Sequence, residues 1–235
     1  MPDLSVVIPA RNEEGTIGVL IDRLRDIFHD TVEIIVVNDH STDKTVDVAM
    51  KHGAWVINNH GKPGYGNTAR TGLLTARGTY VTVMVADLSD DPADLLAMYA
   101  RRGFDHAVFG DRFSGGGETV GYPVLKRIAN RVGNSLAAWL TGTRYRDLTN
   151  PFKLYHRRSI VSLVEASDAD DFSLGFELAL RFVLEGGKFE VVPQHWVERS
   201  VGTSKFKVKH VIGYSRTLAR VLLQRTASRG SVFGH

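Results

Sequence analysis

The first half of the chain alternates short apolar runs with apolar residues at helical spacing. An apolar run of four to eight residues is typical of a buried strand, and apolar positions three or four residues apart predict a helix packed on one side. Because the two patterns alternate, they predict an α/β fold with helices flanking a mostly parallel sheet. The expected strands are residues 4–10, 32–39, 54–59 and 79–87. The expected helices are residues 17–28, a helix that Ser41 or Thr42 caps and that ends at Met50, residues 67–77, and a helix that starts at Pro92.

The second half of the chain is less regular. Helical spacing predicts two further helices, and shorter apolar stretches predict extended segments between them. The expected helices are residues 123–140 and 172–185, and the expected extended segments are 106–113, 149–156 and 188–198.

Polar clusters follow three of the predicted strands. Arg11-Asn12-Glu13 follows the first strand, Asn38-Asp39 ends the second, and Asp87 ends the fourth. Open α/β sheets bind ligands beyond the carboxyl ends of their strands. We therefore expect these side chains to line one crevice.

Asp39 and Asp87 each allow two interpretations. Either aspartate alone is as well explained by capping of the following helix as by ligand binding. Together at one sheet edge they favour a nucleotide and divalent-metal site, because Mg²⁺ or Mn²⁺ bridges a diphosphate to a carboxylate. Asp39 suits hydrogen bonding to a base or ribose.

Several classes of site are excluded by what the chain lacks. The turn PARNEEGTIG has no dinucleotide-binding glycines, and GKPGYGNT lacks the ending of a P-loop. The glycine-rich signature of nucleotidyltransferases is also missing. The absence of cysteine excludes disulfides, thiolate nucleophiles and cysteine-based zinc sites, and the nine histidines show no metal-ligand spacing.

Three groups of cations lie in polar loops. Lys62 in GKPGYG belongs either to a flexible surface loop or to a basic ligand loop. Arg112 before SGGG pairs either with a phosphate or with a surface acid. Arg199 and Lys205 bracket SVGTS, which is either a mobile cationic lid or an exposed turn.

Charge is distributed unevenly along the 235 residues. Seven basic residues and no acidic residue follow Arg199, so the tail carries +7 while the whole chain carries +3. A basic tail indicates an anionic partner surface. An apolar stripe in the tail either enters a membrane interface or packs on the domain. The stripe consists of Val208, Val211, Ile212, Ser215, Leu218, Ala219 and Leu222.

No apolar stretch approaches the roughly 20 residues of a membrane-spanning helix, and the N-terminus lacks the form of a signal peptide. We expect a cytoplasmic chain with one sizeable core, attached peripherally to a membrane or through a membrane partner.

An ordered series of motifs resembles family 2 inverting glycosyltransferases, and most closely the dolichol-phosphate mannosyltransferase group. The matching stretches span residues 4–206. They are VVIPARNEEGTI, VVNDHSTDKT, GKPGYGNTARTGLLTARGTYVTVMVADLSDDP, GDRFSGGG, YRDLTNPFKLYHR and ERSVGTSKF.

The resemblance implies a GT-A fold over residues 1–206, followed by a basic amphipathic helix or tail over 207–235. It also implies an inverting enzyme that binds a nucleotide-sugar donor and uses Mg²⁺ or Mn²⁺. Asp87, Arg112 and Lys205 would be catalytic, and Asp87 and Ser89 would bind the metal. The implied donor-binding residues are Pro9, Arg11, Glu13, Val37, Asp39, Val85, Ala86, Asp87, Ser89, Arg112, Arg199 and Lys205.

Val85 departs from the family's Asp-Ala-Asp-x-Gln motif, as Ser89 does from its Gln. Three consequences stay open. Metal affinity is lowered, or Asp90 or Asp91 compensates, or the metal is dispensable and Arg112, Arg199 and Lys205 neutralise the leaving diphosphate.

The expected reaction transfers a sugar from GDP-mannose or a UDP-sugar to a polyprenyl phosphate, dolichyl or undecaprenyl, with inversion. A phosphate whose second pKa is about 6 needs no strong general base, and the cations to align it include Arg112, Lys126, Arg127 and Arg131. A soluble or polysaccharide acceptor and a non-catalytic GT-A subunit are the alternatives. We expect no nucleic-acid partner.

Overall fold

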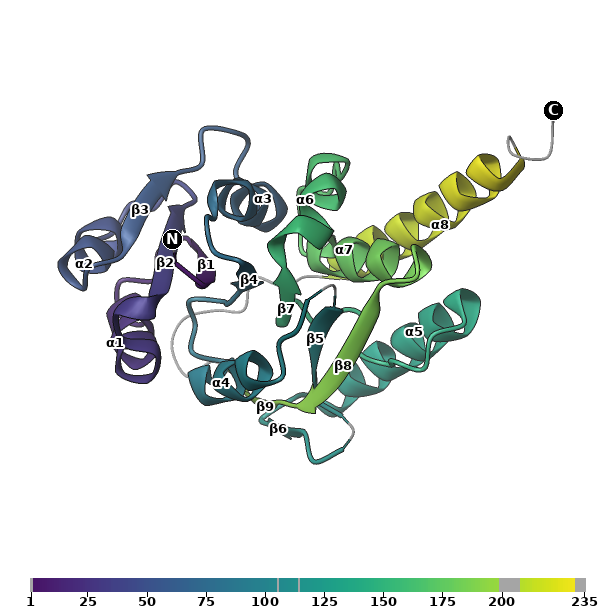
Figure 1. The fold of residues 1–235 in the computed structure, drawn as a ribbon, viewed down its shortest axis with the longest axis horizontal. Coiled ribbons are helices and arrows are strands. Elements are labelled where there is room, and N and C mark those ends of the chain that lie inside the picture. The colour runs from purple at the N-terminus through teal and green to yellow at the C-terminus, as the bar shows by residue number, and fades with distance from the viewer. Residues whose placement is uncertain (1, 105, 114, 199–207, 231–235) are drawn as a thin grey trace.

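The structure is a computed structural model, and it describes residues 2–104, 106–113, 115–198 and 208–230. A seven-stranded sheet lies at its centre (Figure 1). In the spatial order β3-β2-β1-β4-β7-β5-β8, its strands are β3 (Trp55–Asn58), β2 (Val32–Asn38), β1 (Leu4–Ala10), β4 (Tyr80–Val83), β7 (Lys153–His156), β5 (His106–Asp111) and β8 (Lys188–Pro193).

Strand direction decides where the loops of this sheet meet. All neighbouring strands are parallel except β7, which is antiparallel to both β4 and β5. The carboxyl ends of β1, β2, β4, β5 and β8 therefore share one edge of the sheet with the amino end of β7. This edge holds the polar segments singled out in the sequence.

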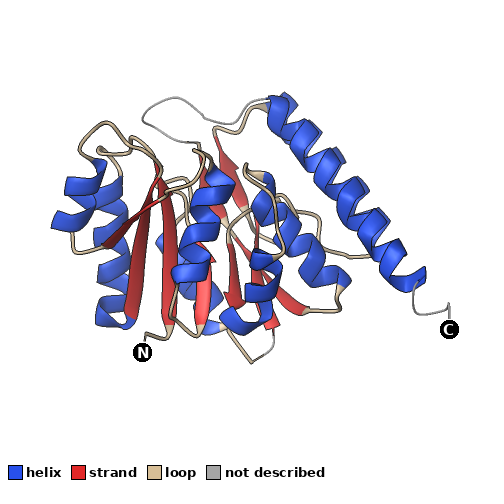
Figure 2. Cartoon of the chain, turned by 90° about the horizontal axis from the view of Figure 1, so that it is seen from above, coloured by secondary structure: helices blue, strands red, loops and turns tan. Residues whose placement is uncertain are grey.

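Helices cover both faces of the sheet (Figure 2). Side chains alternate between the faces along each strand: Val6 and Ile8 pack in one core cluster and Val7 in the other. Burial on both faces explains why β1 and β2 are almost continuously apolar. One face is covered by α1 (Ile17–Phe28), α2 (Thr45–Lys51) and α4 (Pro92–Ala100). The other face is covered by α3 (Tyr65–Thr75), α6 (Arg157–Glu165) and α7 (Ser173–Leu184). A 3₁₀ turn, η1 (His29–Thr31), follows α1.

Two long helices lie on the same side of the molecule as α7 (Figure 1). They are α5 (Val124–Thr141) and α8 (Val208–Gly230). A small parallel sheet of β6 (Glu118–Val120) and β9 (His195–Val197) lies near the start of α5. No helix in the described part of the chain combines the length and the hydropathy that crossing a bilayer requires.

Helix α8 packs on α7, which is one of the two alternatives that the sequence left open for the tail. The buried Glu177 of α7 accepts a hydrogen bond from Nη2 of Arg220 at 2.7 Å, and Thr217 and Val221 are buried in the contact. The predicted stripe packs on the domain only in part, because Ile212, Ser215 and Ala219 are exposed while Leu218 and Leu222 are half-buried. Side chains before Ile212 and after Arg225 lie outside the described part of the helix.

Several predicted boundaries differ from the observed ones. The fourth strand ends at Val83 rather than residue 87, because the chain leaves the sheet after Met84 donates its N–H to the Val7 carbonyl. Neither Ser41 nor Thr42 caps α2: the Asp43 carboxylate accepts the Thr45 N–H at 3.0 Å. The extended segment 188–198 divides between two sheets, and α6 and β6 were not predicted.

Candidate active site

The loops at the shared sheet edge line one large open pocket. Asp39 and Asp87 both lie on its wall, which confirms that the ends of β2 and β4 converge. The predicted site residues that line this pocket are Pro9, Arg11, Glu13, Asp39, Val85, Ala86, Asp87, Ser89 and Arg112.

Of the predicted site residues that the structure describes, Val37 is not on this wall. Val37 was expected to contact the donor, but its side chain is fully buried in the core beneath α3, because the side chains of β2 point alternately to the two covered faces of the sheet. Arg199 and Lys205, predicted to lie either on a mobile cationic lid or in an exposed turn, are outside the described residues.

Left-handed backbone shapes the three loops that carry the site. Asn12 follows β1 with φ 53°, His40 follows β2 with φ 57°, and Leu88 follows β4 with φ 63°. Such conformations cost about 1–3 kcal/mol for residues other than glycine and concentrate at functional sites. Hydrogen bonds hold the first two loops together, since Asn12 N–H donates to Ser41 Oγ and its Oδ1 accepts from Thr42 N–H.

Asp39 fixes the glycine-rich loop against the pocket. Its carboxylate accepts hydrogen bonds from Asn59 Nδ2 at 3.0 Å and from Gly64 N–H at 3.1 Å. Gly66 must be glycine, because a Cβ there would lie 2.5 Å from the Ala169 carbonyl oxygen. The loop predicted to be flexible is therefore held in place, and it brings Pro63, Gly64 and Tyr65, but not Lys62, to the pocket.

Asp87 and Ser89 form a tight turn on the pocket wall. Ser89 N–H donates to Asp87 Oδ1 at 3.1 Å, and the Ser89 carbonyl accepts from Val197 N–H. Between them, the side chain of Leu88 packs toward the core under α1 and α4. The left-handed turn thus sends the apolar residue inward and leaves the polar residues at the pocket.

Asp90 is a buried member of the same wall, with an exposed fraction of 4%. Its Oδ1 accepts a hydrogen bond from Gln194 Nε2 at 2.7 Å, whereas its buried Oδ2 has no hydrogen-bond partner. Burial and the nearby Asp87 carboxylate raise the pKa of Asp90 to about 7, although Arg112 acts in the opposite direction.

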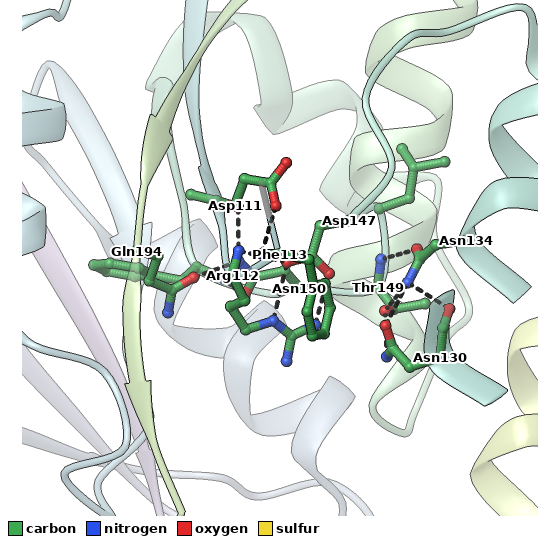
Figure 3. Close-up of polar contacts among 12 residues, drawn as sticks. Asp111, Arg112, Phe113, Asn130, Asn134, Asp147, Thr149, Asn150 and Gln194 are labelled. Carbon is green, nitrogen blue, oxygen red and sulfur yellow. Dashed lines mark hydrogen bonds and ion pairs between the residues drawn. The ribbon is translucent and has the colours of Figure 1, made fainter. Parts of the chain in front are cut away.

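Arg112 reaches the pocket as half of a buried ion pair (Figure 3). Its Nε and Nη2 donate to the Asp147 carboxylate at 2.9 and 2.7 Å, and its backbone N–H donates to the same group. Burial opposes the charge, but Asp147 outweighs burial and raises the pKa of Arg112. Of the two partners foreseen for Arg112, a phosphate or a surface acid, the structure shows an acid, and that acid is buried rather than on the surface.

Amide side chains join this ion pair to the neighbouring elements (Figure 3). Asn150 Nδ2 donates to Gln194 Oε1 at 2.5 Å, which ties the start of β7 to the end of β8. Buried Asn134 of α5 accepts the Thr149 N–H at 2.9 Å. The segment 147–151 therefore sets the position of α5 relative to the sheet edge.

Comparison with known proteins identifies the family. The sequence matches glycosyl transferase family 2 over residues 5–163, more than half of the chain. The chain belongs to glycosyl transferase family 2.

Relatives of this family 2 chain include enzymes named for lipid acceptors. A dolichol-phosphate mannosyltransferase of Pyrococcus furiosus is 27% identical over 93% of the chain and 63% of that relative. Glycosyltransferase AglJ of Haloferax volcanii is 29% identical over 86% and 66%, respectively. A dolichyl-phosphate hexose transferase of the same organism is 29% identical over 94% and 95%. The chain thus spans less than two-thirds of the first two relatives.

Solved structures confirm the predicted GT-A fold for this family 2 chain. Glucosyl-3-phosphoglycerate synthase from Mycobacterium tuberculosis, in complex with Mn²⁺, UDP and glucosyl-3-phosphoglycerate, superposes with a TM-score of 0.70 at 21% identity. The match covers 95% of this chain and 80% of that one. The same enzyme in complex with Mg²⁺ and UDP gives the same TM-score.

Sequence reasoning missed several residues that shape the family 2 site. Asp147 and Asn150 lie in the recognised stretch YRDLTNPFKLYHR, but nothing in the sequence indicates that Asp147 pairs with Arg112, 35 residues away, or that Asn150 bonds to Gln194, 44 residues away. Gln194 lies inside the segment 188–198 that was predicted to be extended throughout, so the sequence did not show that it follows the end of β8. Tyr122 and Trp196, whose ring centroids are 4.9 Å apart, line the pocket without any sequence signal.

The residues of this wall fit a hard divalent cation that also binds a diphosphate. No group of three or more acidic, histidine or cysteine side chains is clustered for a metal within the described ranges. Mg²⁺, however, is commonly held by one or two carboxylates together with substrate phosphates and water. The Asp87 carboxylate lies on the pocket, and Asp90 Oδ2 is a buried acceptor with no partner, so the donor set suits such an ion.

Proposed function

We propose that this family 2 chain transfers a sugar from a nucleotide-sugar donor, GDP-mannose or a UDP-sugar, to a polyprenyl phosphate with inversion. One observation carries the proposal. A single pocket runs from Asp39 and Asp87 at the sheet edge to the facing sides of α5 and α8, and α5 exposes a long apolar face that meets the pocket at Leu136.

The donor end of the pocket is the sheet edge. Arg11, Glu13 and Asp39 would bind the nucleoside, and Asp87 with Ser89 would hold a divalent cation. A bound Mg²⁺ or Mn²⁺ supplies charge neutralisation for the departing diphosphate. The crystallised neighbours with UDP and either Mn²⁺ or Mg²⁺ support this assignment. Lys205 and the Nη1 of Arg112 would also help to neutralise the charge of the departing diphosphate. This Nη1 takes no part in the ion pair with Asp147.

The acceptor end is lined by α5. Lys126 and Asn130, one helical turn apart, both line the pocket, whereas Arg127 and Arg131 do not. Lys126 would hold the acceptor phosphate in line with the sugar, and an ionised phosphate oxygen needs no base to attack. The new bond forms from that oxygen to the anomeric carbon as the bond to the diphosphate breaks, so the configuration inverts.

The exposed apolar face of α5 supports a lipid acceptor. Its residues recur every three or four positions, Trp139 is 77% exposed, and basic residues flank the face. An amphipathic helix with apolar and basic faces suits an anionic membrane interface. The face consists of Val124, Ile128, Val132, Leu136, Trp139 and Leu140, and the basic residues are Lys126, Arg127 and Arg131.

Charging this face should weaken membrane binding. We expect the double variant Val132→Glu, Trp139→Glu to bind anionic phospholipid vesicles at least about tenfold more weakly, because two apolar anchors no longer enter the interface. Vesicle co-sedimentation measures the effect. Leu96→Glu, which changes an exposed apolar residue on α4, is the matched control and should bind as the wild type does. Equal binding by all three proteins would contradict the membrane assignment.

A transfer assay tests the function. The wild-type protein is incubated with GDP-mannose or with UDP-sugars, and with a polyprenyl phosphate in vesicles, a soluble sugar or water as acceptor. We expect a glycosyl phosphoryl polyprenol, detected by mass spectrometry, with inverted anomeric configuration. Transfer to the soluble sugar alone would favour the soluble-acceptor alternative. Nucleotide-sugar binding with no turnover under any condition would favour a non-catalytic subunit.

A further inference from the structure

At position 85 this chain has valine where the family's motif has an aspartate. Val85 lines the pocket two residues before Asp87, and its side chain cannot bind a cation. Asp90 lies on the same wall, and its carboxylate interacts with the backbone N–H of Val85. An acidic group therefore lies beside the very residue that lacks one.

The hydrogen bonds around Asp90 leave one oxygen unused. Asn150 Nδ2 donates to Gln194 Oε1, and this orients the Gln194 amide so that its Nε2 donates to Asp90 Oδ1. The Val85 N–H lies near the Asp90 carboxylate, but Asp90 Oδ2 is buried and makes no hydrogen bond. An ionised Oδ2 without a partner is costly, and a protonated one would be a donor without an acceptor. A cation at Oδ2 removes both penalties.

The neighbouring carboxylate does not offer the same possibility. Asp91 is exposed and does not line the pocket, and its Oδ1 accepts the Ala93 N–H at 2.9 Å as the N-cap of α4. Asp91 thus acts as a helix cap. Of the two substitutes foreseen for the missing carboxylate, only Asp90 is at the pocket.

We propose that Asp90, together with Asp87, supplies the carboxylates of the divalent-cation site, and that Gln194 is the residue that positions Asp90. This inference rests on the proposed nucleotide-sugar donor, because diphosphate oxygens and water complete the coordination. The second carboxylate thus belongs to Asp90, which follows Asp87 in the sequence, and not to position 85, which precedes it.

Binding of Mn²⁺ with UDP or GDP tests the assignment. Isothermal titration calorimetry and Mn²⁺ electron paramagnetic resonance are applied to the wild type, Asp90→Asn and Asp91→Asn. Loss of an outer-shell partner typically weakens metal binding about 10–100-fold, and we expect at least that loss for Asp90→Asn. Asp91→Asn should bind as the wild type does, since asparagine is an equally good helix cap.

Two further measurements separate a metal ligand from a structural residue. Without metal, Asp90→Asn should unfold at a temperature close to that of the wild type, because its Oδ1 still accepts from Gln194 Nε2 and a neutral unpaired amide replaces an unpaired carboxylate oxygen. Mn²⁺ with nucleotide should raise the unfolding temperature of the wild type but not that of the variant. Adding Val85→Asp to Asp90→Asn should restore Mn²⁺ binding.

The outcomes distinguish this inference from the proposed function. If Asp90→Asn binds Mn²⁺ and nucleotide as tightly as the wild type does, the inference is overturned and the donor site stands. Nucleotide binding that Mn²⁺ does not strengthen has the same consequence. If the wild type binds neither UDP nor GDP with or without Mn²⁺, both the inference and the proposed donor are wrong.

Discussion

Replacing Asp87 by alanine should lower the rate of sugar transfer at least about 100-fold, a loss comparable to that of one strong electrostatic contact to the developing charge. Asp87 is an acidic side chain of the pocket wall, in the loop that follows β4. On the proposed assignment, the divalent cation would lose a ligand without it, and the diphosphate would leave less readily. Initial rates with saturating polyprenyl phosphate, measured across Mn²⁺ concentrations, give the size of the loss.

Asp87→Asn is the matched control for folding. Its side-chain oxygen still accepts the Ser89 N–H, so the turn is kept, whereas alanine removes it. We expect both variants to lose activity and only Asp87→Ala to lose about 1 kcal/mol of unfolding free energy, the typical net worth of one hydrogen bond. Activity of Asp87→Asn within a few-fold of the wild type would show that the charge of Asp87 is dispensable.

Replacing Asp147 by alanine should destabilise the protein by about 3–5 kcal/mol, because it leaves a buried charge without its partner. Arg112 is 8% exposed and Asp147 is fully buried, so water cannot replace the lost carboxylate. Asp147 also counteracts the burial that lowers the pKa of Lys153 to about 7, so its removal makes that buried cation less favourable as well. Denaturation by urea, followed by circular dichroism, measures the loss.

The double variant Arg112→Met, Asp147→Leu separates the ion pair from the shape of the site. Replacing both partners of a buried pair by apolar residues is often neutral or stabilising, so most of the loss should be recovered. Arg146→Ala, at an exposed neighbouring position, should change the unfolding free energy by no more than about 0.5 kcal/mol. If Asp147→Ala loses no more unfolding free energy than Arg146→Ala does, the ion pair contributes little to stability.

The parts of the fold that were predictable depend on local patterns. The strands β1 and β2 are buried on both faces, so their sequences are nearly continuously apolar and easily recognised. Helix α5 keeps its apolar spacing although that face is exposed, so the pattern predicted the helix but not the environment of the face. The short strand β6 carries no comparable pattern, and its pairing with the distant β9 defines it. β7 lies within the predicted extended segment 149–156, but its antiparallel pairing with β4 is a tertiary feature.

The site, too, has features that local sequence patterns predict and features that only tertiary contacts decide. Parallel strands bring their carboxyl ends together, so the meeting of Asp39 and Asp87 was predictable from strand order alone. The difference between Asp90 and Asp91 was not, since adjacent acidic residues look alike until the turn at Leu88 sends one into the pocket and the start of α4 holds the other. The prediction for Val37 was wrong, because this residue was expected to bind the donor and its side chain is buried in the core.

The amino-acid sequence by itself determined the alternation of strands and helices, the series of motifs that resembles family 2 glycosyltransferases, and the acidic residues at the ends of β2 and β4, because each depends on neighbours along the chain. Only the tertiary structure decided that Asp147 neutralises Arg112, that Gln194 holds Asp90, and which face of α8 packs on α7. These contacts join residues 35 to 104 positions apart, and the burial and strand direction that create them exist only after the sheet has formed.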